Sequence, residues 1–259
     1  MAHEQVQKLY DEAFQLWQEK NTDRARELID EALRLAPDDL SLHALAMHVK
    51  KEFNTFAHVP HAEFILDHDV NFRDTLDESQ DPFGYADLLL TSYSMMGFRE
   101  KDDDDADTQL VDVARRYCRY AEMILRAGRE IDDLPRYVHA LYGLERYDEV
   151  IDIGKVFIGL KSAAELGLPG LELCDEVDQM GDDPTETILN ACHITNRNEE
   201  ALEYCRAKRE MEPNQWRWHQ LLGEEYCWLN QPEEAARQWI IAIQKGAHLD
   251  YLPEQLNTL

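Results

Sequence analysis

The same spacing of small and large residues occurs twice in this chain, once near each end. The first copy consists of Ala13, Leu16, Ala25, Ile29 and Ala32, and the second of Gly223, Tyr226, Ala235, Trp239 and Ala242. A small residue followed three positions later by a large one puts a close contact and a projecting side chain on the same face of a helix. The second half of each set repeats this arrangement on a following helix. The pattern predicts a helical hairpin that cannot bury its apolar face alone and must stack on neighbouring hairpins.

Two further copies of the spacing lie between these two. Leu189, Cys192, Ala201 and Cys205 each precede their counterparts in the last copy by 34 residues, and Val138, Leu141, Val150, Gly154 and Phe157 form a more degenerate copy. Lys208 occupies the position of Ala32 and Ala242. We therefore expect looser packing there, or a lysine side chain that extends to the surface. We also expect Gly223 to lie at a close helix–helix approach, with Ala235 facing it.

Helix-start and helix-stop residues support these hairpins. In the first copy, Thr22 or Asp23 is the expected cap of the second helix, which should end before Pro37 because proline cannot continue a helix. In the last copy, Pro232 fits the first turn of a helix and Gly246 fits a C-terminal stop.

This pattern resembles the tetratricopeptide repeat (TPR), whose period is about 34 residues. Leu222, Gly223, Tyr226, Ala235, Trp239 and Ala242 match the family's motif, and Ala13, Ala25, Ala32 and Pro37 match it less fully. The resemblance implies an all-α fold of antiparallel helical hairpins stacked in a right-handed superhelix. We expect one solenoid over residues 1–259, with its clearest repeats at 5–37, 131–160, 182–213 and 216–246. Irregular repeats are expected at 38–129 and 161–181, where Gly167, Pro169 and Gly170 interrupt any helix.

The charge of the chain restricts its partners. There are 53 acidic residues against 26 Lys and Arg, for a formal net charge of −27. Nucleic acids and anionic membranes both require a basic surface, so neither is expected as a ligand. A basic protein or peptide is favoured instead by electrostatic complementarity. The alternative is that the acidity serves only solubility, and the oligomeric state is not predicted.

The sequence also indicates a compartment. No apolar run reaches the roughly 20 residues that span a bilayer, and the N-terminus lacks the apolar segment of a signal peptide. The five cysteines are widely spaced and form no Cys-x-x-Cys pair. We expect a cytoplasmic protein in which Cys118 and Cys205 are buried thiols rather than disulfide partners.

The TPR resemblance implies that ligands contact first-helix side chains facing a concave groove. The residues at those positions are Tyr10, Asp11, Phe14, Trp17, His139, Tyr142, Glu186, Asn190, His193, Gln220, Glu224 and Trp228. Aromatic rings beside carboxylates suit a peptide that carries Lys or Arg. The alternative for Phe14 and Trp17 is simple packing on the next repeat. The acidic run Asp102, Asp103, Asp104 and Asp105 is a further candidate contact, although such runs are commonly solvated loops.

A histidine-rich stretch raises one other possibility. It contains His43, His48, His58, His61 and His68, with Asp67 and Asp69 beside the last of these. Imidazole and carboxylate groups together can hold zinc, but no established metal motif is present. We expect no metal and no cofactor, and treat a metal-dependent enzyme built on the His43–Asp69 stretch as an alternative.

No nucleophile elbow, P-loop, dinucleotide fingerprint or kinase motif occurs in the sequence. The favoured function is therefore a non-enzymatic interaction module, a TPR-like scaffold or adaptor that binds a basic protein or peptide in an acidic, aromatic-lined groove. Two alternatives of the same kind stay open: an inhibitory immunity protein against a basic toxin, and an export chaperone for a basic effector.

Overall fold

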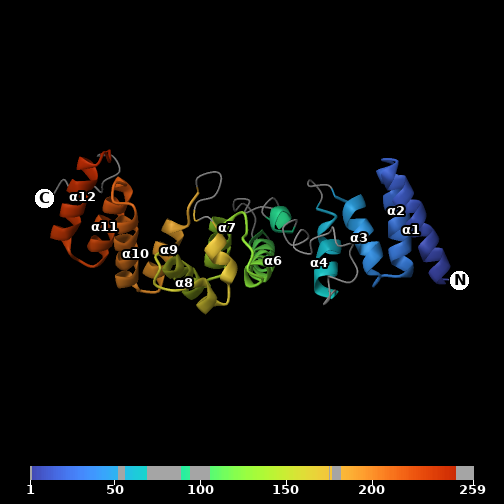
Figure 1. The fold of residues 1–259 in the computed structure, drawn as a ribbon, viewed down its shortest axis with the longest axis horizontal. Coiled ribbons are helices and arrows are strands. Elements are labelled where there is room, and N and C mark those ends of the chain that lie inside the picture. The colour runs from blue at the N-terminus through green and yellow to red at the C-terminus, as the bar shows by residue number, and fades with distance from the viewer. Residues whose placement is uncertain are drawn as a thin grey trace. The chain divides into compact units, whose positions relative to one another are not determined.

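The computed structural model describes residues 2–51, 56–68, 89–93, 106–174, 176 and 182–248 of the chain. These residues form helices and connecting turns, with no strand among them (Figure 1). The prediction of an all-α fold is confirmed for this part of the chain. Contacts divide the molecule into two compact units, Met1–Ile124 and Leu125–Leu259, and each is considered by itself. No helix of the described residues is long and apolar enough to cross a bilayer.

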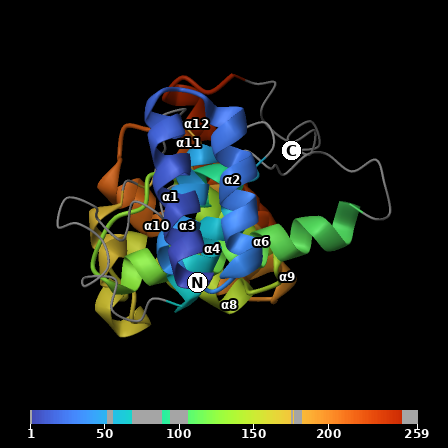
Figure 2. The same ribbon diagram turned by 90° about the vertical axis from the view of Figure 1, so that its right-hand side faces the viewer.

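The first unit begins with a helical hairpin. Helices α1 (Ala2–Gln18) and α2 (Thr22–Leu35) pack side by side, joined by a short turn that reverses the chain (Figure 2). Of the residues in the first copy of the spacing, Ala13, Ala25, Ile29 and Ala32 are fully buried, while Leu16 is half-buried. The small residues therefore let the two helices approach closely, as the spacing predicted.

The start of α2 corrects one expectation. The helix begins at Thr22, so the N-cap is Asn21, and its side chain makes no capping hydrogen bond. The cap is therefore neither Thr22 nor Asp23. The helix ends at Leu35, before Pro37, as expected. The next helix is properly capped, because Asp39 Oδ1 accepts a hydrogen bond from the backbone N–H of Leu42 at 3.1 Å.

Three more helical segments complete the described part of this unit. Helix α3 (Leu40–Val49) packs against α2 and α4 (Val59–His68), and residues 89–93 are helical. Helix α6 (Ala106–Arg126) is tied to α4 by ion pairs. Arg116 Nη1 lies 2.7 Å and 2.8 Å from the two carboxylate oxygens of Glu63, and Arg119 Nη2 lies 2.6 Å from Asp67 Oδ1.

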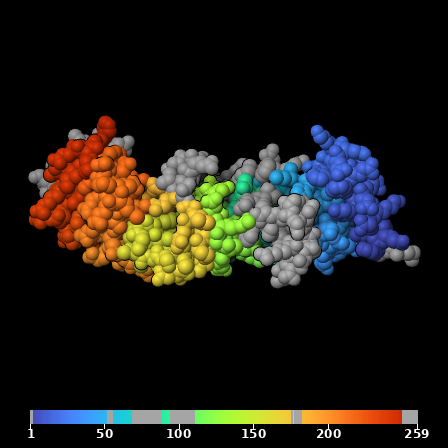
Figure 3. Space-filling model, in the orientation of Figure 1, coloured from blue at the N-terminus to red at the C-terminus, as the bar shows by residue number. Residues whose placement is uncertain are grey.

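The second unit contains the three other expected hairpins. They are α7 (Leu134–Gly143) with α8 (Tyr147–Phe157), α9 (Thr185–Ile194) with α10 (Asn198–Met211), and α11 (Trp216–Trp228) with α12 (Pro232–Gln244). Each helix from α7 to α12 packs against the next in the chain. The space-filling view shows the surfaces of α10 and of the α11–α12 pair in continuous contact (Figure 3). The antiparallel hairpins are thus confirmed, while a single right-handed superhelix stays a prediction.

The stretch between α8 and α9 is irregular, as expected. Its described part forms two short 3₁₀ helices, η1 (Ala163–Leu166) and η2 (Pro169–Leu173), separated by Gly167 in the left-handed conformation. Gly170 lies directly against the backbone of Arg129, because a Cβ atom placed on it would come within 2.0 Å of the Arg129 carbonyl oxygen. No other residue fits so close a backbone contact.

Two glycines of the repeats lie at close helix contacts. A Cβ atom on Gly223 would lie 2.1 Å from Trp239 Nε1, so the group that fills this site is the indole of Trp239 rather than Ala235. A Cβ atom on Gly154 would lie 2.7 Å from Ile188 Cγ2, on the first helix of the following hairpin. Gly223 and Gly154, at two different positions of the repeat, therefore each make room for a large side chain from a neighbouring helix.

Lys208 does not extend to the surface, so the second of the two expectations for this position is wrong. The residue is 4% exposed. Its ammonium group pairs with Glu176 and lies about 6 Å from the ring centres of Phe157, Tyr204 and Trp218. Burial of an ammonium group requires such a partner, so this lysine ties the irregular stretch to α10.

Candidate functional site

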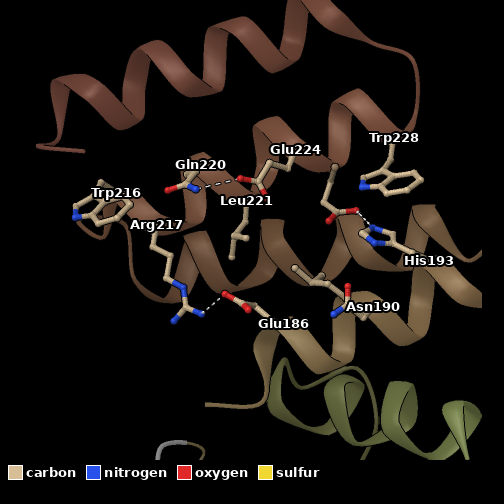
Figure 4. Close-up of a pocket in the computed structure, with 11 residues that line it drawn as sticks. Glu186, Asn190, His193, Trp216, Arg217, Gln220, Leu221, Glu224 and Trp228 are labelled. Carbon is tan, nitrogen blue, oxygen red and sulfur yellow. Dashed lines mark hydrogen bonds and ion pairs between the residues drawn. The ribbon is translucent and has the colours of Figure 1, made fainter. Parts of the chain in front are cut away.

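A pocket of about 520 Å³ opens between α9 and α11 (Figure 4). Side chains from the first helices of two successive hairpins form its walls. The lining residues are Glu186, Leu189, Asn190 and His193 from α9 and Trp216, Arg217, Gln220, Leu221, Glu224, Glu225 and Trp228 from α11. Six of the groove residues named from the sequence are among them: Glu186, Asn190, His193, Gln220, Glu224 and Trp228.

Helical spacing explains the α9 wall. Glu186, Asn190 and His193 are separated by four and three residues, which puts them on one face of the helix. The opposite face of α9 carries Ile188 and Cys192, which are buried in the core. Burial of the apolar face therefore turns the polar face toward the pocket.

The α11 wall combines a polar row with exposed aromatic surface. Gln220 Nε2 donates a hydrogen bond to Glu224 Oε1 at 3.1 Å, one turn further along the helix. Trp228 is 61% exposed at the C-terminal end of α11. A large, exposed indole at the edge of a polar pocket is typical of a binding surface.

Glu225 is a buried carboxylate at the back of the pocket. It is 2% exposed, and its Oε2 accepts a hydrogen bond from His193 Nε2 at 2.8 Å. The imidazole of His193 stacks on the indole of Trp228, with 4.6 Å between ring centres. Burial raises the pKa of Glu225, and the hydrogen bond from His193 partly offsets this effect. The buried carboxylate thus fixes the imidazole, and the imidazole fixes the indole.

The pocket carries more negative than positive charge. Glu186, Glu224 and Glu225 contribute carboxylates, and Arg217 contributes the guanidinium. Arg217 pairs with Asp183, and its Nη2 lies 3.9 Å from Glu186 Oε1. Burial raises the pKa of Glu224, against the hydrogen bond from Gln220, which lowers it. The site is suited to a cationic group and contains aromatic surface for it to stack on.

The groove residues of the first unit form a separate aromatic row. Tyr10 stacks on Phe14 with ring centres 6.3 Å apart, and Phe14 lies 5.9 Å from Trp17. Trp17 also contacts the ring of His48 on α3 at 5.8 Å, so it packs on the next helix pair. Asp11 is exposed and accepts a hydrogen bond from Gln7 at 2.9 Å.

The remaining candidates do not join either group. On α7, His139 is exposed, and Tyr142 packs edge-on against Tyr147 of α8 at 5.3 Å between ring centres. The acidic run Asp102–Asp105 lies outside the described residues. The structure therefore gathers half of the groove candidates into one pocket and leaves the others apart.

Sequence reasoning missed part of the pocket. Arg217 and Leu221 lie three residues before Gln220 and Glu224, so a helical projection of α11 places them on the same face. Glu225 gave no such signal, because it follows Glu224 directly and belongs to the buried side of the helix. Its position in the pocket depends on His193, which is 32 residues away in the chain.

The histidine-rich stretch forms local contacts. His61 Nδ1 lies 3.1 Å from His43 Nδ1, and His43 Nε2 donates to the carbonyl of Pro37 at 2.8 Å. Burial lowers the pKa of His61 to about 4. Within the described residues, no three His, Cys, Asp or Glu side chains are arranged to hold a metal ion. Asp69 lies outside those residues, so the expected lack of metal stays a prediction.

Cys118 and Cys205 were expected to be buried thiols. Cys118 and Cys205 are buried, and none of the five cysteines, all of which lie in the described part of the chain, forms a disulfide. Burial raises the pKa of the Cys205 thiol, which keeps it protonated and unreactive.

Comparison with known proteins adds little to this description. No family model and no curated protein matches the chain. Among solved structures, a thermophilic TPR protein from Thermus thermophilus is similar, at 13% sequence identity and a TM-score of 0.28, over 95% of this chain and 94% of that one. So low a TM-score does not establish a shared fold. The helical hairpins are instead defined by the helix pairs and the buried contacts of the chain itself.

Proposed function

We propose that this chain is a non-enzymatic protein-interaction module that binds a basic segment of a partner in the α9–α11 pocket. The observation that carries the proposal is the convergence of three carboxylates and the exposed indole of Trp228 on one cavity. A Lys or Arg side chain meets both requirements of such a site, since it pairs with carboxylates and stacks on an aromatic face. The acidic excess of the whole chain adds long-range attraction for the same partner.

The test uses fluorescently labelled octapeptide pools, one with Lys or Arg at alternating positions and one with Asp or Glu there, measured by anisotropy. The basic pool should bind, and its association rate should fall as salt is raised, because exposed charges are screened over about 8 Å at physiological ionic strength. Dissociation should change less. Binding of the acidic pool, or binding indifferent to salt, would contradict the proposal.

A matched pair of variants locates the site. Glu224→Gln removes one charge from the pocket, and Glu203→Gln removes one from an exposed position on α10 outside it. Glu224→Gln should weaken binding of the basic pool by about tenfold, which is the order of one charge-assisted hydrogen bond. Glu203→Gln should leave it nearly unchanged. Equal effects of the two variants would show that only net charge matters.

A further inference from the structure

We propose that the residue recognised in the α9–α11 pocket is specifically an arginine, whose planar guanidinium lies between Glu186 and Glu224 with one face toward Trp228. This inference rests on the proposed function and narrows it from a basic segment to one side chain. It follows from the placement of the acceptors, the shape of the cavity and the behaviour of the pocket's own arginine.

The acceptors lie on two different helices. Glu186 is on α9 and Glu224 on α11, and Figure 4 shows them on opposite walls of the pocket. A guanidinium presents five N–H donors in a plane and can bond to carboxylates on more than one side at once. An ammonium group is a compact, strongly hydrated charge without this planar set of donors, so it is less suited to two carboxylates on opposite walls.

Trp228 supplies a surface on which a planar cation can stack. One face of its indole is stacked on His193, which the buried Glu225 holds in place. This fixed orientation lowers the entropy that ordering the ring would cost on binding. Because the indole is 61% exposed, much of its surface is open to a ligand. Guanidinium groups stack on aromatic faces more readily than ammonium groups do.

Arg217 shows that a guanidinium is compatible with this acidic wall. It pairs with Asp183 and also with Glu186, and Figure 4 shows the second of these pairs. The same arginine also competes with a ligand, because it neutralises part of the charge of Glu186. Replacing Arg217 with glutamine should therefore strengthen ligand binding, whereas replacing Glu224 should weaken it. Net charge alone would give the same two signs, so the size of each effect is compared with that of Glu203→Gln, which lies outside the pocket.

The first test is an NMR titration of the full chain with Nα-acetyl-arginine N-methylamide, its lysine counterpart and its neutral citrulline counterpart. The readout is the indole N–H signals of Trp228 and Trp216, with Trp228→Phe used for assignment. The arginine probe should shift these signals in a saturable way and bind about tenfold more tightly than the lysine probe. Citrulline has nearly the same shape without the charge, and it should cause no shift.

The variants provide the second readout. Arg217→Gln should tighten binding of the arginine probe and Glu224→Gln should weaken it, while Glu203→Gln should have no effect. Circular dichroism confirms that each variant is folded. If Arg217→Gln does not fold, Glu186→Gln replaces it and should weaken binding. An Arg217→Gln protein that folds and binds no more tightly would overturn the placement of the guanidinium.

The third test is the pH dependence of binding of the arginine probe. The ionisable groups around the site are Glu186 and His193 from α9, Arg217, Glu224 and Glu225 from α11, and Asp183, which precedes α9 and pairs with Arg217. Because burial raises the pKa of Glu224, this side chain takes up a proton at a higher pH than an ordinary glutamate near 4.3. Protonation of Glu224 removes a charge that holds the ligand. Binding should therefore weaken as the pH is lowered and Glu224 takes up its proton, and it should be restored when the pH is raised again.

The outcomes separate this inference from the proposed function. Equal binding of the arginine and lysine probes would overturn the arginine assignment but leave a basic-segment module intact. A lack of shift with every probe, together with binding of the basic octapeptides, would place recognition elsewhere on the chain. Failure of both probes and peptides would overturn the function itself.

Discussion

Gly223 and Trp239 illustrate how single residues set the packing of a repeat. They are sixteen positions apart, and the pairs Ala13 with Ile29, Leu189 with Cys205 and Val138 with Gly154 occupy the equivalent positions in the other repeats. In each pair a larger residue on one helix is matched by a smaller one on the other. Of these pairs, Gly223 and Trp239 are in direct contact, whereas the side chain nearest to Gly154 is Ile188. At the Gly223–Trp239 contact, a change in the volume of one residue therefore affects the other.

A double-mutant cycle tests this pairing. Gly223→Ala should lower the free energy of unfolding by about 1–3 kcal/mol, because the added methyl group would overlap the indole of Trp239. This cost exceeds the gain in helix propensity, which is at most about 1 kcal/mol. The same substitution in a Trp239→Ile background, which imitates Ala13 with Ile29, should cost less. Denaturant titration by circular dichroism measures all four proteins, and strict additivity of the two changes would show that the residues do not interact.

Lys208 shows the limit of reading single positions from a pattern. The repeat favours a small residue at this position, so the sequence predicted either looser packing or a lysine side chain that extends into solvent. Instead the ammonium group stays inside, because Glu176 supplies a counter-charge and three aromatic rings surround it. Glu176, from the irregular stretch between α8 and α9, thus allows a lysine to be buried at a position where the first and last repeats have alanine.

At the scale of elements, helices α2 and α3 begin in different ways. Asp39 caps α3 with a side-chain hydrogen bond to the N–H of Leu42, whereas Asn21 precedes α2 without one. Asparagine is as good an N-cap residue as aspartate, so the difference comes from the turn before each helix. The turn conformation of the backbone decides whether the side chain can reach the free N–H groups.

A second pair of variants measures this difference. Asp39→Ala should lower the free energy of unfolding by about 1 kcal/mol, through loss of the cap. Asn21→Ala should cost much less, since no capping bond is lost, and Asp39→Asn should retain most of the stability. Thermal and urea unfolding followed by the helical signal will show the order. Equal losses for the two alanine variants would mean that Asn21 also caps its helix in solution.

At the scale of the whole molecule, the formal charge of −27 is the dominant feature. A net charge so far from zero opposes compaction, because like charges repel across the folded chain. Ion pairs such as Glu63 with Arg116 and Asp67 with Arg119 offset part of this repulsion locally. The sequence nevertheless has 27 more acidic residues than Lys and Arg, so a net repulsion between carboxylates is left.

The melting temperature should therefore rise with salt. Between about 10 mM and 150 mM KCl the Debye length falls from about 30 Å to about 8 Å, which weakens repulsion between distant carboxylates more than it weakens ion pairs in contact. Circular dichroism melts at fixed pH check this, with the uncharged solute sucrose at matched osmolarity as a control for general solvent effects. A melting temperature that falls over this range would show that ion pairs outweigh the repulsion.

The sequence by itself determined the helical hairpins and the positions at which they pack. The spacing of Ala13, Ala25, Gly223 and Ala235 is a local, periodic property, and close approach at such positions follows from helix geometry alone. The resemblance to the TPR, which rests on this periodicity, implied that Glu186, His193 and Glu224 lie on the groove faces of first helices. The acidity is a property of composition alone, and it favours a cationic ligand whatever the fold.

Only the tertiary structure decided which of these faces meet. The relative rotation of α9 and α11 depends on the packing of buried side chains from several helices, which a one-dimensional pattern does not encode. The same holds for Glu225, whose partner His193 comes from another repeat, and for Lys208, whose counter-charge comes from an irregular stretch. A buried charge is tolerated only where the folded chain places a partner beside it. The roles of Glu225 and Lys208 therefore depend on contacts in three dimensions and not on their positions in the repeat.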